Sequence, residues 1–199
     1  MNANLGAQGP EQDGELLMLE TPTGKIAGTL LMPKASGAVP LAVIIAGSGP
    51  TDRNGNSPLI PGANNSLKLL SEGLAAHGIA SLRYDKRGIG ASAAASLSEA
   101  NLRFDNSAED AAGWVDRLRQ DPRFSTITIV GHSEGSLIGM LAAGKAKIDG
   151  FVSLCGSGEP IGATLRAQLK RGLPKDWPRT ESRRCATTSA ASARARPPW

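Results

Sequence analysis

Residues 130–135 read Val-Gly-His-Ser-Glu-Gly, and this stretch decides how the rest of the chain is interpreted. It places a Gly-x-Ser-x-Gly pattern between an apolar, strand-like run and a helical pattern rich in Gly and Ala. That context predicts a sharp strand-to-helix turn that raises Ser133 above a sheet, with glycines that let neighbouring backbone approach closely. Such a turn is typical of a nucleophile elbow with Ser133 as the catalytic nucleophile. The alternative is a serine that only caps the following helix.

The segments around this turn predict an α/β fold with a doubly wound, mostly parallel sheet. Continuous apolar runs are typical of parallel strands buried on both faces, and here they alternate with helical patterns. The expected strands are 41–46, 79–84, 126–130 and 150–155, and the expected helices are 65–77, 107–120 and 134–146. Residues 16–20 and 25–32, joined by Thr-Pro-Thr-Gly, predict an antiparallel hairpin before this sheet.

A glycine-rich loop follows the first of the parallel strands. Residues 46–56 read Ala-Gly-Ser-Gly-Pro-Thr-Asp-Arg-Asn-Gly-Asn. The loop resembles the one that supplies one backbone N–H of the oxyanion hole in α/β-hydrolases, which implies the N–H of Ser48 or Gly49 here and that of Glu134 as the second donor. A tight connecting turn or a phosphate cradle is the alternative, although no Gly-x-Gly-x-x-Gly pattern or Walker lysine completes a phosphate site.

A second polar loop follows the next parallel strand. Residues 83–92 read Arg-Tyr-Asp-Lys-Arg-Gly-Ile-Gly-Ala-Ser, and we expect this loop to close the edge of the site. We expect Asp85 and Arg87 to form structural ion pairs rather than to act on substrate.

Together these motifs resemble the α/β-hydrolase superfamily, over about residues 14–170. The resemblance is closest to bacterial esterases related to dienelactone hydrolases and serine aminopeptidases. It implies that Ser133 forms an acyl-enzyme with small-molecule carboxylic esters of small acyl groups, and it implies no metal or organic cofactor. It also implies an acid and then a histidine after the elbow, in that order along the chain.

The chain departs from that pattern after the elbow, because both of its histidines lie at or before residue 132. His77 is expected to cap a helix, and the side chain of His132 should diverge from its neighbour Ser133. Glu159 is the candidate acid. We therefore expect a C-terminally truncated hydrolase with its last strands missing, with impaired activity and with an exposed sheet edge open to self-association. The alternative is a non-catalytic, hydrolase-like interaction protein.

Composition and charge divide the chain into three expected parts. The formal net charge is +4, but residues 1–163 carry 13 Lys and Arg against 16 Asp and Glu, whereas residues 164–199 carry 9 against 2. We expect a disordered N-terminus at 1–13, a partial α/β-hydrolase domain at 14–173 and a disordered basic tail at 174–199. The composition of the tail resembles out-of-frame translation of a GC-rich gene.

The same composition excludes several function classes. Aromatic content of 4% and arginines scattered without periodicity argue against nucleic-acid binding. No apolar segment is long enough to cross a membrane and no signal peptide is evident, so we expect a cytoplasmic protein. The two cysteines form no CxxC motif; Cys155 is expected in the core, and Cys185 falls in the tail.

Overall fold

We describe the protein from a computed structural model, which defines residues 14–98 and 100–172. The elements in chain order are β1 (Glu15–Thr21), β2 (Gly24–Leu31), β3 (Val39–Ile45), α1 (Ser66–Ala76), β4 (Ala80–Tyr84), η1 (Gly90–Ala95), α2 (Phe104–Arg119), β5 (Phe124–His132), α3 (Glu134–Ala143), β6 (Gly150–Leu154) and α4 (Ile161–Gly172). The chain divides after Ser157 into two units, and α4 belongs to the second. The expectations for residues 1–13 and 174–199 lie outside the described residues.

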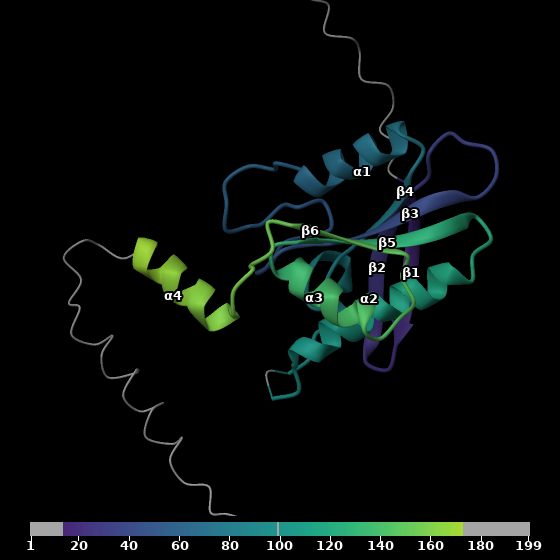
Figure 1. Ribbon diagram of the computed structural model, residues 1–199. Helices are drawn as coiled ribbons and strands as arrows, with labels where there is room; N and C mark the ends of the chain where they lie inside the picture. Colours follow the sequence, from purple (N-terminus) through teal and green to yellow (C-terminus); the bar gives the residue numbers. More distant parts are fainter. Residues whose placement is uncertain (1–13, 99, 173–199) are drawn as a thin grey trace, which may run out of the picture. The chain divides into compact units, whose positions relative to one another are not determined.

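The first unit contains one six-stranded sheet in the order β1-β2-β4-β3-β5-β6 (Figure 1). β1 pairs with β2, and β2 with β4, in antiparallel fashion. The pairs β3–β4, β3–β5 and β5–β6 are parallel. The predicted fold class is confirmed, with four parallel strands after an N-terminal hairpin.

Helices cover both faces of this sheet, with α1 on one face and α2 and α3 on the other (Figure 1). Side chains alternate along β3 as the two-residue period of a strand requires. Val43 and Ile45 join the cluster that contains Trp114 of α2, whereas Ile44 joins the cluster that contains Leu67 of α1. The predicted burial of β3 on both faces is therefore confirmed.

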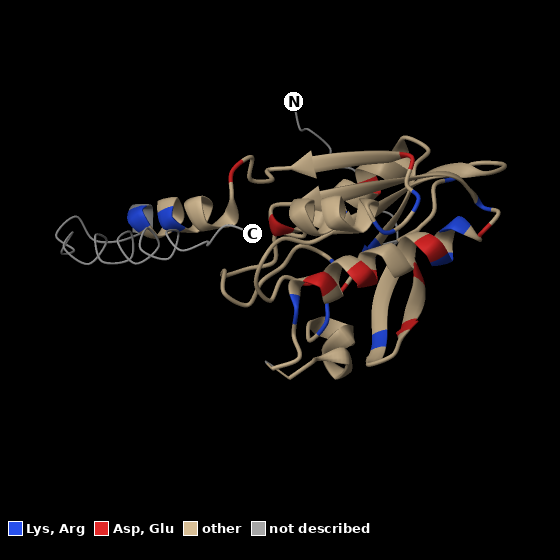
Figure 2. Cartoon of the chain, turned by 60° about the horizontal axis from the view of Figure 1, so that its bottom comes forward, with Lys and Arg blue, Asp and Glu red and all other residues tan. Residues whose placement is uncertain are grey.

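The exposed surface of α2 has a charge pattern that suits its helix dipole. Asp105 lies in the first turn, and Arg117 and Arg119 lie in the last turn. Figure 2 marks the acidic and basic residues along the ribbon. Acidic groups near the N-terminus and basic groups near the C-terminus each stabilise a helix by a few tenths of a kcal/mol to about 1 kcal/mol.

The expected burial of residues 150–155 is wrong. Val152 of β6 is 43% exposed, and Cys155 is an exposed free cysteine just beyond the strand rather than a core residue. β6 ends the sheet that the structure describes, so no strand on its outer side covers it. An apolar run therefore identified the strand but not its burial.

None of the helices in the described ranges has both the length and the hydropathy needed to cross a membrane.

Candidate active site

Ser133 lies in a strained turn between β5 and α3. Its backbone angles are φ 53° and ψ −117°, and a non-glycine residue in such a conformation costs about 1–3 kcal/mol. Two hydrogen bonds hold the turn: the Ser133 N–H donates to the Leu154 carbonyl at 2.8 Å, and the Ser136 N–H donates to the Ser133 carbonyl at 3.0 Å. The surrounding backbone thus fixes Ser133 at the carboxyl end of β5.

The glycines on either side of Ser133 permit close backbone packing. A Cβ atom on Gly131 would lie 2.3 Å from the carbonyl oxygen of Gly135. A Cβ atom on Gly135 would lie 2.4 Å from the carbonyl oxygen of Ile45 in β3. Both distances are shorter than real contacts allow, so the turn and the start of α3 require glycine at both positions.

The loop after β3 lies directly against this turn. A Cβ atom on Gly47 would lie 3.0 Å from His132 Nδ1 and 3.4 Å from Ser133 Cβ. Ser48 and Gly49 follow in the chain, and the Thr51 hydroxyl donates to the Ser48 carbonyl at 2.9 Å. The structure therefore brings the glycine-rich loop to Ser133 and Glu134. This follows from the topology, because the carboxyl ends of neighbouring parallel strands meet at one edge of the sheet.

Lys86 joins this site, and the sequence interpretation missed it. Its Nζ donates to the Gly47 carbonyl at 2.6 Å and lies 3.2 Å from Glu134 Oε1. The Lys86 side chain is only 11% exposed. Its position in the loop after β4, which pairs with β3, was the one sequence signal that could have indicated it.

Asp85 and Arg87, on either side of Lys86, have structural ion pairs as expected. Asp85 accepts hydrogen bonds from the backbone N–H of Arg53 at 2.7 Å and of Ala91 at 2.9 Å, and it pairs with the Arg53 guanidinium at 3.2 Å. Arg87 makes two hydrogen bonds of 2.7 Å to Asp110. Burial raises the pKa of the Asp110 carboxyl, although the hydrogen bonds and charge of Arg87 oppose that rise.

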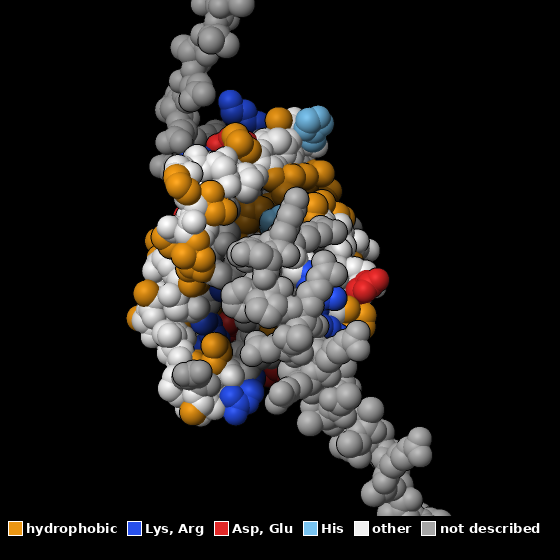
Figure 3. Space-filling view, turned by 90° about the vertical axis from the view of Figure 1, so that its left-hand side faces the viewer, with side chains coloured by type: hydrophobic (Ala, Val, Ile, Leu, Met, Phe, Trp, Pro, Cys, Tyr) orange, Lys and Arg blue, Asp and Glu red, His pale blue; other side chains and the backbone are white. Residues whose placement is uncertain are grey.

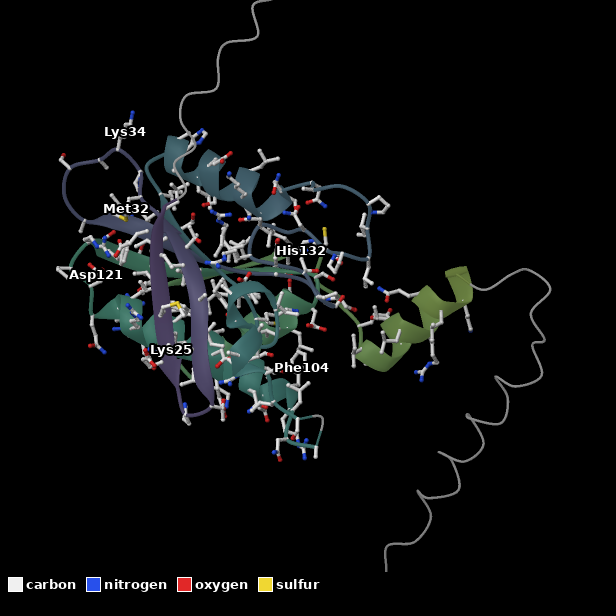
Figure 4. The ribbon with its side chains drawn as sticks, turned by 180° about the vertical axis from the view of Figure 1, so that it is seen from behind. Lys25, Met32, Lys34, Phe104, Asp121 and His132 are labelled. Atoms are coloured by element: carbon white, nitrogen blue, oxygen red, sulfur yellow. The ribbon has the colours of Figure 1, made fainter. Side chains whose placement is uncertain are left out.

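Of the two histidines, His77 lies at a helix end as the sequence indicated. His77 ends α1, where its Nδ1 lies 2.8 Å from the Gly73 carbonyl oxygen. His132 ends β5 and lies against Gly47, at the opposite end of the sheet from Asp121 (Figure 4). Within residues 14–98 and 100–172, no hydrogen bond joins either imidazole to Ser133 Oγ. Glu159 lies in the second unit, in the bend before α4.

A cavity adjoins the glycine-rich loop. Its volume is about 470 Å³, and Pro50, Ile60 and Ile89 are among the residues that line it. This size falls within the range of about 300–1,000 Å³ that small-molecule sites occupy. Leu59 and Ile60, which follow the glycine-rich loop in the chain, are 76% and 60% exposed. Figure 3 shows further hydrophobic side chains at the surface of one face of the molecule.

The sequence of this chain matches a known protein family and a curated relative. Residues 63–180 match the family described as serine aminopeptidase, S33. Esterase EstD of Thermotoga maritima is 30% identical over 146 residues, which are 73% of this chain and 34% of the esterase. The chain thus spans about a third of the length of that curated relative.

Solved structures show the same fold. Est1E of Butyrivibrio proteoclasticus, with ferulic acid bound, is 26% identical with a TM-score of 0.51, over 65% of this chain and 47% of that one. An α/β serine hydrolase without a lid from Xanthomonas campestris is 20% identical with a TM-score of 0.54, over 72% and 61%. The matched family, the esterase relative and the shared sheet agree: the chain belongs to the serine aminopeptidase S33 family of the α/β-hydrolase superfamily.

Proposed function

We propose that Ser133 is the nucleophile of a serine hydrolase that acts on carboxylic esters of small acyl groups. The single observation that carries the proposal is the turn at Ser133, strained at φ 53° and packed against Gly47 of the loop after β3. Strain of this kind persists only where the surrounding structure enforces it, and it gathers at active sites. The esterase relative supports an ester as the substrate.

The chemistry follows from the groups at this edge of the sheet. Ser133 Oγ adds to the ester carbonyl carbon, and the negative charge that develops on the carbonyl oxygen is stabilised by the N–H groups of Ser48 or Gly49 and Glu134. Glu134 begins α3, where the first N–H groups have no acceptor within the helix. Collapse of the tetrahedral intermediate breaks the bond to the alcohol oxygen, which leaves as the alcohol after taking from solvent the proton that Ser133 Oγ gave up. The acyl group stays on Ser133 until water removes it as the carboxylic acid.

The described residues place no general base beside Ser133. A serine hydroxyl needs an adjacent base, and neither histidine is hydrogen-bonded to Ser133 Oγ within the described residues. Glu159, the acid expected from the sequence, belongs to the second unit, so no contact between it and the Ser133 site is assigned. We therefore expect slow turnover, since an oxyanion hole and substrate binding alone give roughly 10³–10⁴-fold acceleration over water.

The test is covalent labelling of the full chain with a fluorophosphonate, read by intact-protein mass spectrometry, together with hydrolysis of p-nitrophenyl acetate. We expect one label on Ser133 and a burst of p-nitrophenol followed by slow deacylation. Ser133→Ala should abolish both signals. Ser125→Ala is the matched control, because Ser125 is exposed at the start of the same strand.

Two results would change the proposal. Robust turnover by Ser133→Ala would remove Ser133 as the nucleophile. Faster release of p-nitroaniline from alanine p-nitroanilide than of p-nitrophenol from the acetate would make a peptide, rather than an ester, the substrate.

A second candidate function is a non-catalytic interaction protein that associates through β6. The supporting observation is a contrast between the two edges of the described sheet. β1 carries Glu15 and Glu20, which pair with Arg123 and Lys25, whereas β6 reads Gly-Phe-Val-Ser-Leu with no charge. Charged side chains protect an edge strand from pairing with another chain, and β6 lacks them.

Sedimentation velocity over a range of concentrations tests this second function. We expect the chain to self-associate with or without residues 174–199, and Val152→Lys to make it monomeric. Leu16→Lys is the matched control on β1, where Leu16 is 65% exposed. Monomeric behaviour of the unmodified chain at every concentration would argue against an interaction role for this edge.

A further inference from the structure

Lys86 donates one hydrogen bond to each of the two segments that form the proposed oxyanion hole. One acceptor is the Gly47 carbonyl in the loop after β3, and the other is the Glu134 carboxylate in the first turn of α3. These acceptors are 39 and 48 residues from Lys86 in the sequence, so a single ammonium group connects two loops and the start of α3 at the carboxyl ends of the parallel strands. The inference below rests on the proposed function, because it concerns the same site.

The bond to Gly47 constrains an N–H group as well as a carbonyl. The Gly47 carbonyl and the Ser48 N–H belong to one planar peptide group and point in opposite directions. A cation held 2.6 Å from the carbonyl oxygen therefore fixes the direction of the Ser48 N–H. Hydrogen bonding at the oxygen also polarises the peptide, so that its N–H becomes a stronger donor.

The bond to Glu134 constrains the second donor. The Glu134 carboxylate lies 3.2 Å from Lys86 Nζ, and the backbone N–H of the same residue is the other proposed oxyanion donor. Holding this side chain fixes the first turn of α3 relative to the loop after β3. The two donors must converge on one oxygen atom, at about 2.7–3.1 Å from it.

The burial of Lys86 indicates that its side chain stays hydrogen-bonded to Gly47 and Glu134. Its side chain is 11% exposed, and the Glu134 side chain is 34% exposed. A buried ammonium group is costly unless acceptors surround it, and these two acceptors compensate that cost. The exposed pair between Lys25 and Glu20 differs, since both side chains are more than 60% exposed.

We propose that Lys86 is a positioning residue of the oxyanion hole, which aims the Ser48 and Glu134 amides at the same substrate oxygen. Lys86 stays bound to Gly47 and Glu134 and does not touch the reacting atoms. Its removal should slow acylation of Ser133 without weakening the initial binding of the acylating reagent.

The experiment measures the inactivation rate constant and the binding constant of a fluorophosphonate separately, on the full chain. Lys86→Met should lower the rate constant at least about tenfold and change the binding constant by less than about threefold, because oxyanion stabilisation acts on the transition state. Lys86→Arg should restore part of the rate. Lys25→Met is the matched control, since Lys25 also pairs with a glutamate but lies on the hairpin, away from His132 (Figure 4).

A second readout does not depend on reactivity. In ¹H–¹⁵N spectra, Lys86→Met should shift the Ser48 and Glu134 amide signals, and Lys25→Met should leave them in place. Should Lys86→Met lose cooperative thermal unfolding, Lys86→Gln replaces it, because a glutamine still donates to one acceptor.

The two readouts separate this inference from the proposed function. An unlabelled wild-type chain would contradict the nucleophile assignment, and the amide shifts would then decide the role of Lys86. Unchanged amide signals, or a labelling rate for Lys86→Met equal to that of Lys25→Met, would overturn the inference.

Discussion

β3 and β6 flank β5 on opposite sides, and they contribute to the turn at Ser133 in different ways. In sequence both are short apolar runs that end in a polar loop. In the structure Ile44 and Ile45 of β3 are 1% and 0% exposed, whereas Val152 of β6 is 43% exposed. The difference lies in their neighbours, because β3 is enclosed by β4 and β5 while β6 ends the described sheet.

The two strands also support different parts of the site. The Leu154 carbonyl at the end of β6 accepts the Ser133 N–H, which holds the backbone of the turn. The loop after β3 places Gly47 against the Ser133 side chain, and Lys86 holds that loop in place. The chemical groups proposed for catalysis thus depend on the buried strand, and the strained turn depends on both.

The largest effect should come from a methyl group placed between α3 and β3. In Gly135→Ala the new Cβ would lie 2.4 Å from the Ile45 carbonyl oxygen and 2.8 Å from that of Ala46. Neither backbone atom can move without displacing the buried strand, so we expect a loss of about 3 kcal/mol in the free energy of unfolding. Urea unfolding followed by circular dichroism measures it.

Gly73→Ala in α1 is the control for this change. A Cβ at Gly73 meets nothing within 4 Å, and replacing glycine by alanine within a helix should stabilise the protein by roughly 0.5–1 kcal/mol. Equal changes in the free energy of unfolding at the two positions would show that the start of α3 does not pack tightly against β3.

The next largest effect on stability should come from a Val→Ala substitution, which we compare in the two strands that flank β5. Val43 of β3 is fully buried, and Val43→Ala should cost about 2 kcal/mol because it leaves a cavity as well as removing apolar contacts. Val152→Ala in β6 should cost at most about 0.5 kcal/mol, since much of its side chain already contacts solvent. Urea midpoints of the two variants measure the difference, and equal losses would contradict the contrast between an interior and an edge strand.

Much of this fold could be predicted from local patterns. The parallel strands appeared as apolar runs, and α2 appeared as a stripe that includes Trp114 and Leu118, both of which are buried. The meeting of Ser133 with the glycine-rich loop was also predictable. Parallel strands of one sheet end on the same side, so the loops that follow them lie together whatever their separation in the sequence.

The features that the sequence did not predict depend on which strands lie next to each other, and no local pattern specifies that. Lys86 reaches Gly47 and Glu134 only because β3 lies between β4 and β5, and that order involves pairings between distant segments. The exposure of Cys155 has the same origin, since an apolar run does not indicate whether another strand will cover it. Sequence therefore predicted the groups proposed to react with substrate better than the group proposed to position them.

The smallest effect should come from Asp149, which attaches the start of β6 to β5. Its carboxylate accepts the Ile127 N–H at 2.7 Å and pairs with Arg119 at 2.8 Å, and these contacts hold its pKa below the usual range. A lowered pKa means that the ionised carboxylate stabilises the folded state above the ordinary aspartate pKa of about 3.9, and that this stability is lost as the pH falls through the lower folded-state value. Asp149→Asn should therefore lower the urea midpoint slightly at neutral pH, and its difference from wild type should shrink below about pH 4. Asp116→Asn, on the exposed surface of α2, provides the matched control. A difference between wild type and Asp149→Asn that is the same at acidic and neutral pH would mean that the charge of Asp149 does not hold β6 in place.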